Sequence, residues 1–134
     1  DEVDGRTARH DFVRFRKGLE KAGASAEEIE EANARYPNPH HPVIRTHPET
    51  GRKSLYVNLA HTSRFDGMTE AESAPMLAYL FQHQIRPEFT CRFQWRTGSM
   101  AFWDNRCTLH NPVNDYHGHR RVMHRITIAG DAPV

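Results

Sequence analysis

The sequence has no run of about 18 apolar residues, so no segment predicts a transmembrane helix. It has no block of lysines and arginines, and its net charge is only +1, so nothing in its charge indicates nucleic-acid binding. The only cysteines, Cys91 and Cys107, are not in a CxxC pair, which argues against a zinc module. We expect free thiols and a cytoplasmic protein, although one disulfide stays open.

Histidine is the residue that the sequence has in excess, with ten among 134 residues. Its imidazole is the commonest side-chain metal ligand and changes charge near physiological pH. Abundance alone selects no site, because most histidines in proteins lie on the surface or fill a core. The role of each histidine therefore has to be inferred from the residues around it.

Two helical segments are predicted in the first quarter of the chain. Residues 1–24 indicate an irregular entry segment with a short helix around Phe12. The stretch SAEE, residues 25–28, matches a capping box, in which the serine and the last glutamate cap a helix start reciprocally. We expect this second helix to run to about Arg35, where the prolines that follow end it.

A hairpin is predicted next. Residues 41–46 and 53–58 are rich in strand-forming side chains, and residues 47–52 between them have the composition of a turn. Gly51 can supply the positive φ that such a turn requires. We therefore expect two antiparallel strands joined by a tight connection.

A third helix is predicted before residue 85. The stretch TEAE, residues 69–72, is a second capping box, but Pro75 is tolerated only in a first helical turn, so Ser73 is an alternative cap. The helix would bury an apolar stripe and end near Ile85. The stripe consists of Met76, Leu77, Leu80 and Phe81.

The second half predicts strands. Residues 89–96 alternate cleanly between apolar and polar side chains, which is typical of a half-buried antiparallel strand. A turn at 97–99, a strand at 100–103 and a last strand at 121–128 follow. No linker divides the chain, so we expect one domain, mainly β with flanking helices.

Two arginines share one face of the last predicted strand. Residues i and i+4 of a strand point the same way, so Arg121 and Arg125 would project together, roughly 13 Å apart at their Cα atoms. Arginine pairs bidentately with carboxylates, sulfates and phosphates. The spacing alone favours a solvated face for the pair, but His110, eleven residues before Arg121, and the sequence around it favour an anion pocket instead.

The combined pattern resembles the TauD/TfdA family of Fe(II)- and 2-oxoglutarate-dependent dioxygenases. The resemblance rests on WDNRCTLH at residues 103–110, the two arginines that follow, and the closing RITIAGDAP. It extends upstream through HPVIRTHPETGRKSLYVN at 41–58 and the stretch at 71–106. ARHDF at residues 8–12 resembles the entry to this region. The similarity covers nearly the whole chain, and its motifs are specific as a set.

The resemblance implies a role for four residues. His110 would be the distal histidine of the facial triad that binds Fe(II). Arg121 would bind the remote carboxylate of the cosubstrate 2-oxoglutarate, and Arg125 would pair with an anionic substrate. His61 would line the substrate pocket. Residues 103–106 would orient the histidine rather than take part in the chemistry.

One family motif is absent, because no H-x-D occurs among the 134 residues. His47-Pro48-Glu49 satisfies H-x-E literally, but it lies in the predicted hairpin turn and is not expected to bind iron. His117-Gly118-His119 is read as a surface loop. We expect residues 1–134 to be the C-terminal portion of one dioxygenase domain, with the missing motif in an N-terminal portion. A degenerate, non-catalytic homologue is the alternative.

The implied fold is part of a double-stranded β-helix, a jelly roll with helices packed outside. The implied function is hydroxylation of a small anionic substrate with O2. The first expectation is taurine or a related sulfonate, whose hydroxylated product would release sulfite. Alkylsulfates, aryloxyalkanoates and a non-catalytic anion-binding jelly roll are the alternatives. We expect no nucleic-acid or membrane partner, and the sequence is compatible with a homo-oligomer. Exposed strand edges should make residues 1–134 poorly stable on their own.

Overall fold

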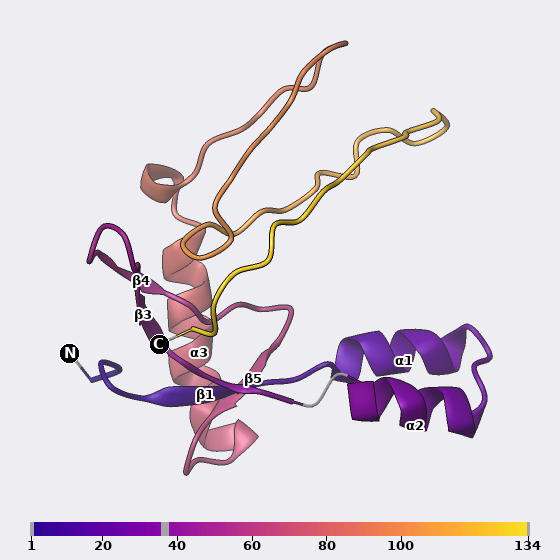
Figure 1. Cartoon of the computed structure of the whole chain (residues 1–134). Coiled ribbons are helices and arrows are strands. Elements are labelled where there is room, and N and C mark those ends of the chain that lie inside the picture. Colours follow the sequence, from indigo (N-terminus) through magenta and orange to yellow (C-terminus); the bar gives the residue numbers. More distant parts are fainter. Residues whose placement is uncertain (1, 36–37, 134) are drawn as a thin grey trace.

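The computed structural model describes residues 2–35 and 38–133, and its regular elements all lie before residue 90 (Figure 1). A three-stranded antiparallel sheet has the order β2-β1-β5, with β1 (Thr7–His10) in the centre between β2 (His40–Pro42) and β5 (Thr62–Phe65). The sequence did not predict β1, because its four residues include two polar, basic side chains. A register shift between Arg9 and His10 bends this strand against β5.

The predicted hairpin is present, although its strands are shorter than expected. β3 (Ile44–Thr46) pairs antiparallel with β4 (Lys53–Leu55). The turn is closed by backbone hydrogen bonds from the amide of His47 to the carbonyl of Arg52 and from the amide of Gly51 to the carbonyl of His47. Gly51 has φ +68°, which confirms the expected use of a glycine.

Two helices precede the hairpin and lie side by side (Figure 1). α1 (Val13–Lys21) begins after Phe12, close to the expected position. α2 (Ala26–Arg35) has the predicted capping box, in which the amide of Glu28 donates to the Ser25 hydroxyl and the amide of Ser25 donates to the Glu28 carboxylate. Its predicted end at Arg35 is confirmed.

α3 (Glu70–Gln84) packs against β5 and is followed by a short 3-10 turn, η1 (Pro87–Phe89). Its cap is Thr69, with both hydrogen bonds of the capping box, so the alternative cap Ser73 is wrong. Ser73 is instead fully buried, and its hydroxyl accepts a hydrogen bond from the amide of Phe65.

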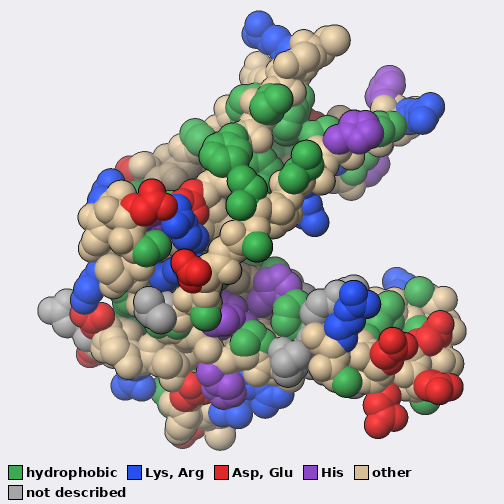
Figure 2. Space-filling model, viewed as in Figure 1, with side chains coloured by type: hydrophobic (Ala, Val, Ile, Leu, Met, Phe, Trp, Pro, Cys, Tyr) green, Lys and Arg blue, Asp and Glu red, His purple; other side chains and the backbone are tan. Residues whose placement is uncertain are grey.

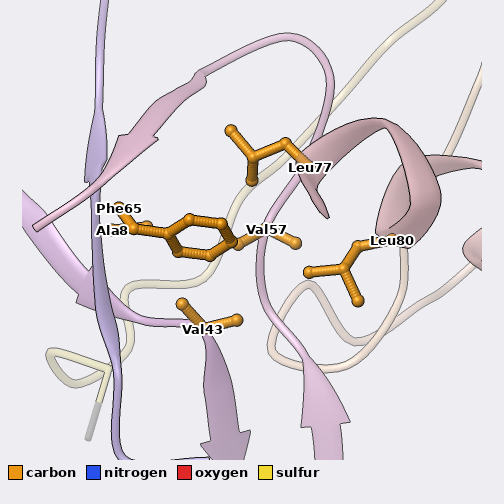
Figure 3. Close-up of a cluster of buried hydrophobic side chains, with 6 residues drawn as sticks. All are labelled: Ala8, Val43, Val57, Phe65, Leu77 and Leu80. Atoms are coloured by element: carbon orange, nitrogen blue, oxygen red, sulfur yellow. The ribbon is translucent and has the colours of Figure 1, made fainter. Parts of the chain in front are cut away.

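The core lies between the three-stranded sheet, the hairpin and α3 (Figure 3). Phe65, fully buried, has its ring among side chains from the neighbouring elements. Removing such a side chain from water contributes roughly 1.5–3 kcal/mol. Within the part of the chain that the structure describes, the buried apolar residues of this core are Ala8, Val43, Val57, Phe65, Leu77 and Leu80.

Beyond residue 90 the described chain has no helix and no hydrogen-bonded strand, so the strands predicted at 89–96, 100–103 and 121–128 are wrong in this structure. We call residues 91–133 the arm, and residues 2–35 and 38–90 the scaffold. The arm makes two long extended excursions away from α3 (Figure 1). Extended segments become strands only when their backbone groups meet a neighbouring ladder, and these segments do not.

The predicted burial of the last strand is wrong for the same reason. In an alternating strand, Val122, Ile126 and Ile128 would face away from Arg121 and Arg125 and toward a core, but they are 58%, 94% and 76% exposed. Phe93 and Trp95 belong to the apolar set of the alternating stretch at 89–96, and their ring centroids lie 4.9 Å apart, yet both are exposed. Figure 2 shows hydrophobic side chains gathered on the visible face of the arm. The arm thus has the alternating apolar and polar residues of a half-buried strand, but no other described segment covers its apolar side.

Candidate functional site

His110 lies on the arm just after a short turn at residues 105–107. Its ring packs against the indole of Trp103, with centroids 5.0 Å apart. The indole Nε1 donates a hydrogen bond of 2.9 Å to the side-chain oxygen of Asn105, which holds the ring across the turn. Neither ring nitrogen of His110 has a hydrogen-bond partner among the described residues, so both can reach a ligand.

Arg121 lies beside a depression in the arm, with its guanidinium carbon 5.1 Å from the centre of the Tyr116 ring. This stacking orients the planar fork. No ion pair of Arg121 or Arg125 is present within the described part of the chain. The depression also contains one carboxylate, Asp115, which would repel an anion. It is lined by Trp95, Asp115, Tyr116, Arg120, Arg121, Val122 and Met123.

His61 lies on the scaffold rather than on the arm, in the turn before β5. It is exposed, and its ring lies 5.3 Å from that of Phe12. Its backbone amide donates to the side-chain oxygen of Asn58. Among the described residues, no hydrogen bond, ion pair or ring contact joins His61, His110, Arg121 and Arg125 to one another. The four residues singled out from the sequence therefore do not form one constellation here.

His47 makes a contact between scaffold and arm that the sequence did not reveal. It follows β3 and is 9% exposed, and its Nε2 lies 3.1 Å from Oδ2 of Asp104 on the arm. The alternation could have indicated the burial of His47, though not its partner, since His47 continues the inward phase of Val43 and Arg45, which are also buried. The carboxylate thus meets a histidine from a segment 57 residues away in the sequence.

Arg106 completes this contact. Its Nη2 lies 2.6 Å from Oδ2 of Asp104 and 2.9 Å from Oε1 of Glu49, the exposed carboxylate two residues after His47. Its Nε donates to both Asp104 oxygens, at 2.9 and 3.0 Å. These bonds from Arg106, together with that from His47, hold the pKa of Asp104 far below its usual range. The two carboxylates in turn raise the pKa of Arg106.

A cation could in principle be held here, since ligand atoms of His47, Asp104 and Cys107 all lie within 4.8 Å of one another. The hydrogen bonds argue against it. Arg106 already neutralises the carboxylate and places a fixed positive charge beside it. The His47 nitrogen that faces Asp104 is also the one that a metal would need. The cluster therefore has the chemistry of a hydrogen-bonded contact rather than of a metal centre.

A second histidine cluster lies in the scaffold. The ring of His10 lies 4.8 Å from that of His41 and 5.9 Å from that of Tyr56, and its Nε2 is 3.3 Å from the Thr62 hydroxyl. Burial lowers the pKa of His10 to about 4, assisted by the positive charge that His41 and His61 can carry. At neutral pH this histidine is uncharged, which suits a packed ring better than a proton carrier.

No helix among the described residues is long and apolar enough to cross a membrane. Cys91 and Cys107 are both free and exposed, so the predicted free thiols are confirmed and the disulfide left open is absent.

Comparison with known proteins identifies relatives over most of the chain. The model of the family described as taurine catabolism dioxygenase TauD, TfdA family matches residues 1–127. An alkylsulfatase from Acinetobacter baylyi is 46% identical over 68% of this chain and 28% of its own length. An alpha-ketoglutarate-dependent 2,4-dichlorophenoxyacetate dioxygenase from Cupriavidus pinatubonensis is 40% identical over 69% of this chain and 32% of its own length.

The fold has a counterpart among solved structures. A taurine dioxygenase from Burkholderia xenovorans superposes with a TM-score of 0.57 at 37% identity, over 78% of this chain and 31% of the other. The expected fold class is thereby confirmed as part of a jelly roll with helices outside. The chain spans about a third of the length of these relatives, as the coverages of 28%, 32% and 31% state.

Proposed function

The chain belongs to the TauD/TfdA family, and we propose that it forms part of a dioxygenase that uses 2-oxoglutarate, Fe(II) and O2 to hydroxylate a small organic anion. The observation that carries this proposal is the match over residues 1–127, which includes His110, Arg121 and Arg125. Iron and 2-oxoglutarate, when bound, supply the oxidising chemistry that inserts oxygen into a C–H bond of the substrate.

His110 fits the role of a metal ligand by its surroundings. Its nitrogens have no hydrogen-bond partner among the described residues, and the indole of Trp103 supports one side of the ring. A neutral imidazole nitrogen is a good iron ligand. No H-x-D occurs in these residues, so in this proposal His110 is one ligand of three and the other two come from outside the 134 residues.

The two arginines fit the binding of anions. Arg121, stacked on Tyr116, would pair its fork with the remote carboxylate of 2-oxoglutarate. Arg125 would pair with the anionic group of the substrate. His61 would approach that substrate from the scaffold side.

The substrate is proposed as a class, because a guanidinium pairs with sulfonate, sulfate ester and carboxylate alike. The relatives differ in the same way, since one is named for alkylsulfates and another for an aryloxyacetate. Taurine, the first expectation from the sequence, remains one member of the class. A cytoplasmic location is supported by the free thiols of Cys91 and Cys107, and a homo-oligomer would cover exposed apolar side chains of the arm.

The test uses the full-length enzyme with Fe(II), 2-oxoglutarate and a panel of sulfonates, sulfate esters and aryloxyalkanoates, with succinate as the measured product. His110→Ala should abolish succinate formation with every substrate. Arg121→Ala should raise the KM for 2-oxoglutarate, whereas Arg125→Ala should raise the KM for the organic anion.

Two results would contradict these roles. Succinate formation that survives His110→Ala would remove this histidine from the metal site. An Arg121→Ala variant with an unchanged dependence on 2-oxoglutarate would remove the proposed cosubstrate contact. An anion-binding jelly roll without catalysis would bind members of the panel but form no succinate at all.

A further inference from the structure

His110 lies on an arm that has turns but no helix and no paired strand among its described residues, so side-chain contacts must fix its place relative to the scaffold. Among the hydrogen bonds and ion pairs of the described residues, those that join the arm to the scaffold run from His47 to Asp104 and from Arg106 to Glu49. Asp104 is six residues before His110 in the sequence. The contact therefore lies close to the proposed metal ligand.

We propose that His47 and Glu49, in the turn of the β3–β4 hairpin, are positioning residues that hold Asp104 and Arg106 and thereby set the place of His110. This inference rests on the proposed function, because it takes His110 as a metal ligand. Neither hairpin residue would touch iron, cosubstrate or substrate. Both would act through the turn that leads to the histidine.

The hydrogen bonds of His47 have a defined direction. Its Nδ1 faces the backbone amides of Glu49 and Thr50, both at 3.3 Å, so Nδ1 accepts. Nε2 consequently carries the hydrogen and donates to Asp104, whose carboxylate can only accept. The hairpin turn thus sets the tautomer, and burial of the side chain restricts its rotamer. His47 presents a pre-oriented donor to the arm.

Asp104 passes this constraint on to the turn after it. Its Oδ1 accepts the backbone amide of Arg106 at 2.8 Å, and its carbonyl accepts the amide of Cys107 at 3.3 Å. The residue before it, Trp103, packs on His110 itself. The turn is therefore connected to the scaffold at one side chain and to the proposed ligand at the neighbouring one.

Arg106 strengthens the arrangement to a smaller extent. Its planar fork bridges Asp104 and Glu49, which ties the two segments together with opposite charges. The Glu49 side chain is 71% exposed, so water and salt weaken this pair. The bond between His47 and Asp104 is the more protected of the two contacts, since the His47 side chain is only 10% exposed.

Two substitutions of His47 in the full-length enzyme separate the contact with the arm from the contacts within the hairpin. In His47→Gln the terminal amide can still donate where Nε2 does, but the Nδ1 acceptor is lost. In His47→Asn the side-chain oxygen can replace Nδ1, but the donor to Asp104 is lost. Positioning of the arm predicts that the glutamine variant resembles the parent and the asparagine variant does not. A role confined to the hairpin turn predicts the reverse.

The first readout needs no metal and no turnover. Cys107 is exposed and lies in the turn, so its labelling by a thiol reagent reports the turn's freedom in a background where it is the only cysteine. We expect faster labelling in His47→Asn than in the parent, and the parent's rate in His47→Gln. The second readout is the affinity for Fe(II), which should fall about 10- to 100-fold in His47→Asn and stay near the parent's value in His47→Gln.

A matched control is Arg86→Gln, which breaks an exposed arginine–glutamate pair of 3.0 Å on the scaffold side and should change neither readout. If His47→Asn does not fold, Asp104→Asn removes the charge that both partners share and should speed labelling of Cys107. Equal labelling rates in the glutamine and asparagine variants, or the reverse order, would overturn the positioning role. Retained Fe(II) affinity in His110→Ala would instead overturn the proposed metal role and leave the labelling result to decide the anchoring.

Discussion

The scaffold and the arm both contain many apolar residues, but those of the scaffold core are buried and most of those of the arm are exposed. The six apolar side chains found buried among the described residues all lie in the scaffold, as do all the described helices and paired strands. The arm carries most of the large exposed apolar side chains, Met100 and Phe102 among them at 88% each. Alternation of apolar residues is therefore not enough to make a strand, because a partner must supply the ladder and the cover.

The two regions also differ in how far they are packed and in which of the proposed site residues they carry. The scaffold pairs backbone groups in helices and strands, whereas the arm carries His110, Arg121 and Arg125 and leaves its apolar side chains exposed. An arm that needs cover fits a chain that spans 28% and 32% of two relatives. We expect substitutions in the scaffold to change folding, and matched substitutions in the arm to leave it unchanged.

The largest difference should come from removing one aromatic ring in each region. Phe65→Ala leaves a cavity in the core and should lower the free energy of unfolding by about 3–5 kcal/mol. Phe102→Ala removes a ring that is 88% exposed and should change it by less than about 0.5 kcal/mol. Urea titration followed by circular dichroism measures both, and similar losses would show that the arm is packed in solution.

A smaller difference should come from two serines that accept the same kind of hydrogen bond. Ser73 accepts from the amide of Phe65 and Ser99 from the amide of Arg96, both at 3.0 Å. Ser73→Ala buries an unpaired amide and should destabilise by about 1–3 kcal/mol. Ser99→Ala frees an amide that water can reach, so its effect should be near zero. The same urea titration tests the pair, and equal effects would contradict the assigned burial.

The scaffold should also weaken on mild acidification. The folded pKa of His10 is about 4, below the unfolded value near 6.5, so the unfolded chain binds more protons between these values. The stabilisation is complete above about pH 6.5 and is lost as the pH falls toward 4. The loss should be on the order of 1–2 kcal/mol after allowance for residual hydration.

His10→Gln should flatten this part of the pH profile of unfolding, whereas His119→Gln on the exposed arm should leave it unchanged. A profile that keeps its slope in His10→Gln would assign the titration to another group.

The smallest difference concerns a helix cap. Thr69→Ala removes the hydroxyl that accepts the amide of Glu72 and should destabilise by about 1 kcal/mol. Thr108→Ala, in the exposed arm, should have no measurable effect on unfolding. Thr69→Ser should restore most of the stability, because serine caps as well as threonine. Thermal unfolding resolves the three variants, and failure of serine to rescue would point to the methyl group instead.

Features that depend only on near neighbours in the sequence were predicted correctly, and features that depend on distant partners were not. The capping boxes at residues 25–28 and 69–72 and the glycine turn at Gly51 were predictable, because each depends on neighbours within a few residues. The strand β1 was not predicted, since its place in the centre of a sheet depends on partners more than 30 residues away. The strands predicted at 89–96, 100–103 and 121–128 are the opposite error. Their residues were predicted to form strands, but these segments pair with no neighbouring strand in the described part of the structure.

The candidate site divides in the same way. The motif around His110 and the spacing to Arg121 and Arg125 lie within one stretch of sequence, so a resemblance could identify them. The contact of His47 with Asp104 joins segments 57 residues apart and shows in no local pattern. Which side chains meet across such a distance depends on the packing of the hairpin against the arm.

By itself, the sequence determined the family, the caps, the hairpin and the residues proposed to bind metal and anions, because these depend on chemistry within short windows. Only the tertiary structure decided which alternating segments become strands, which histidine is buried and neutral, and which residues anchor the turn before His110. The physical reason is that burial and hydrogen-bond pairing are properties of two segments together. A segment's own sequence states what it can bury or donate, and the partner determines whether it does.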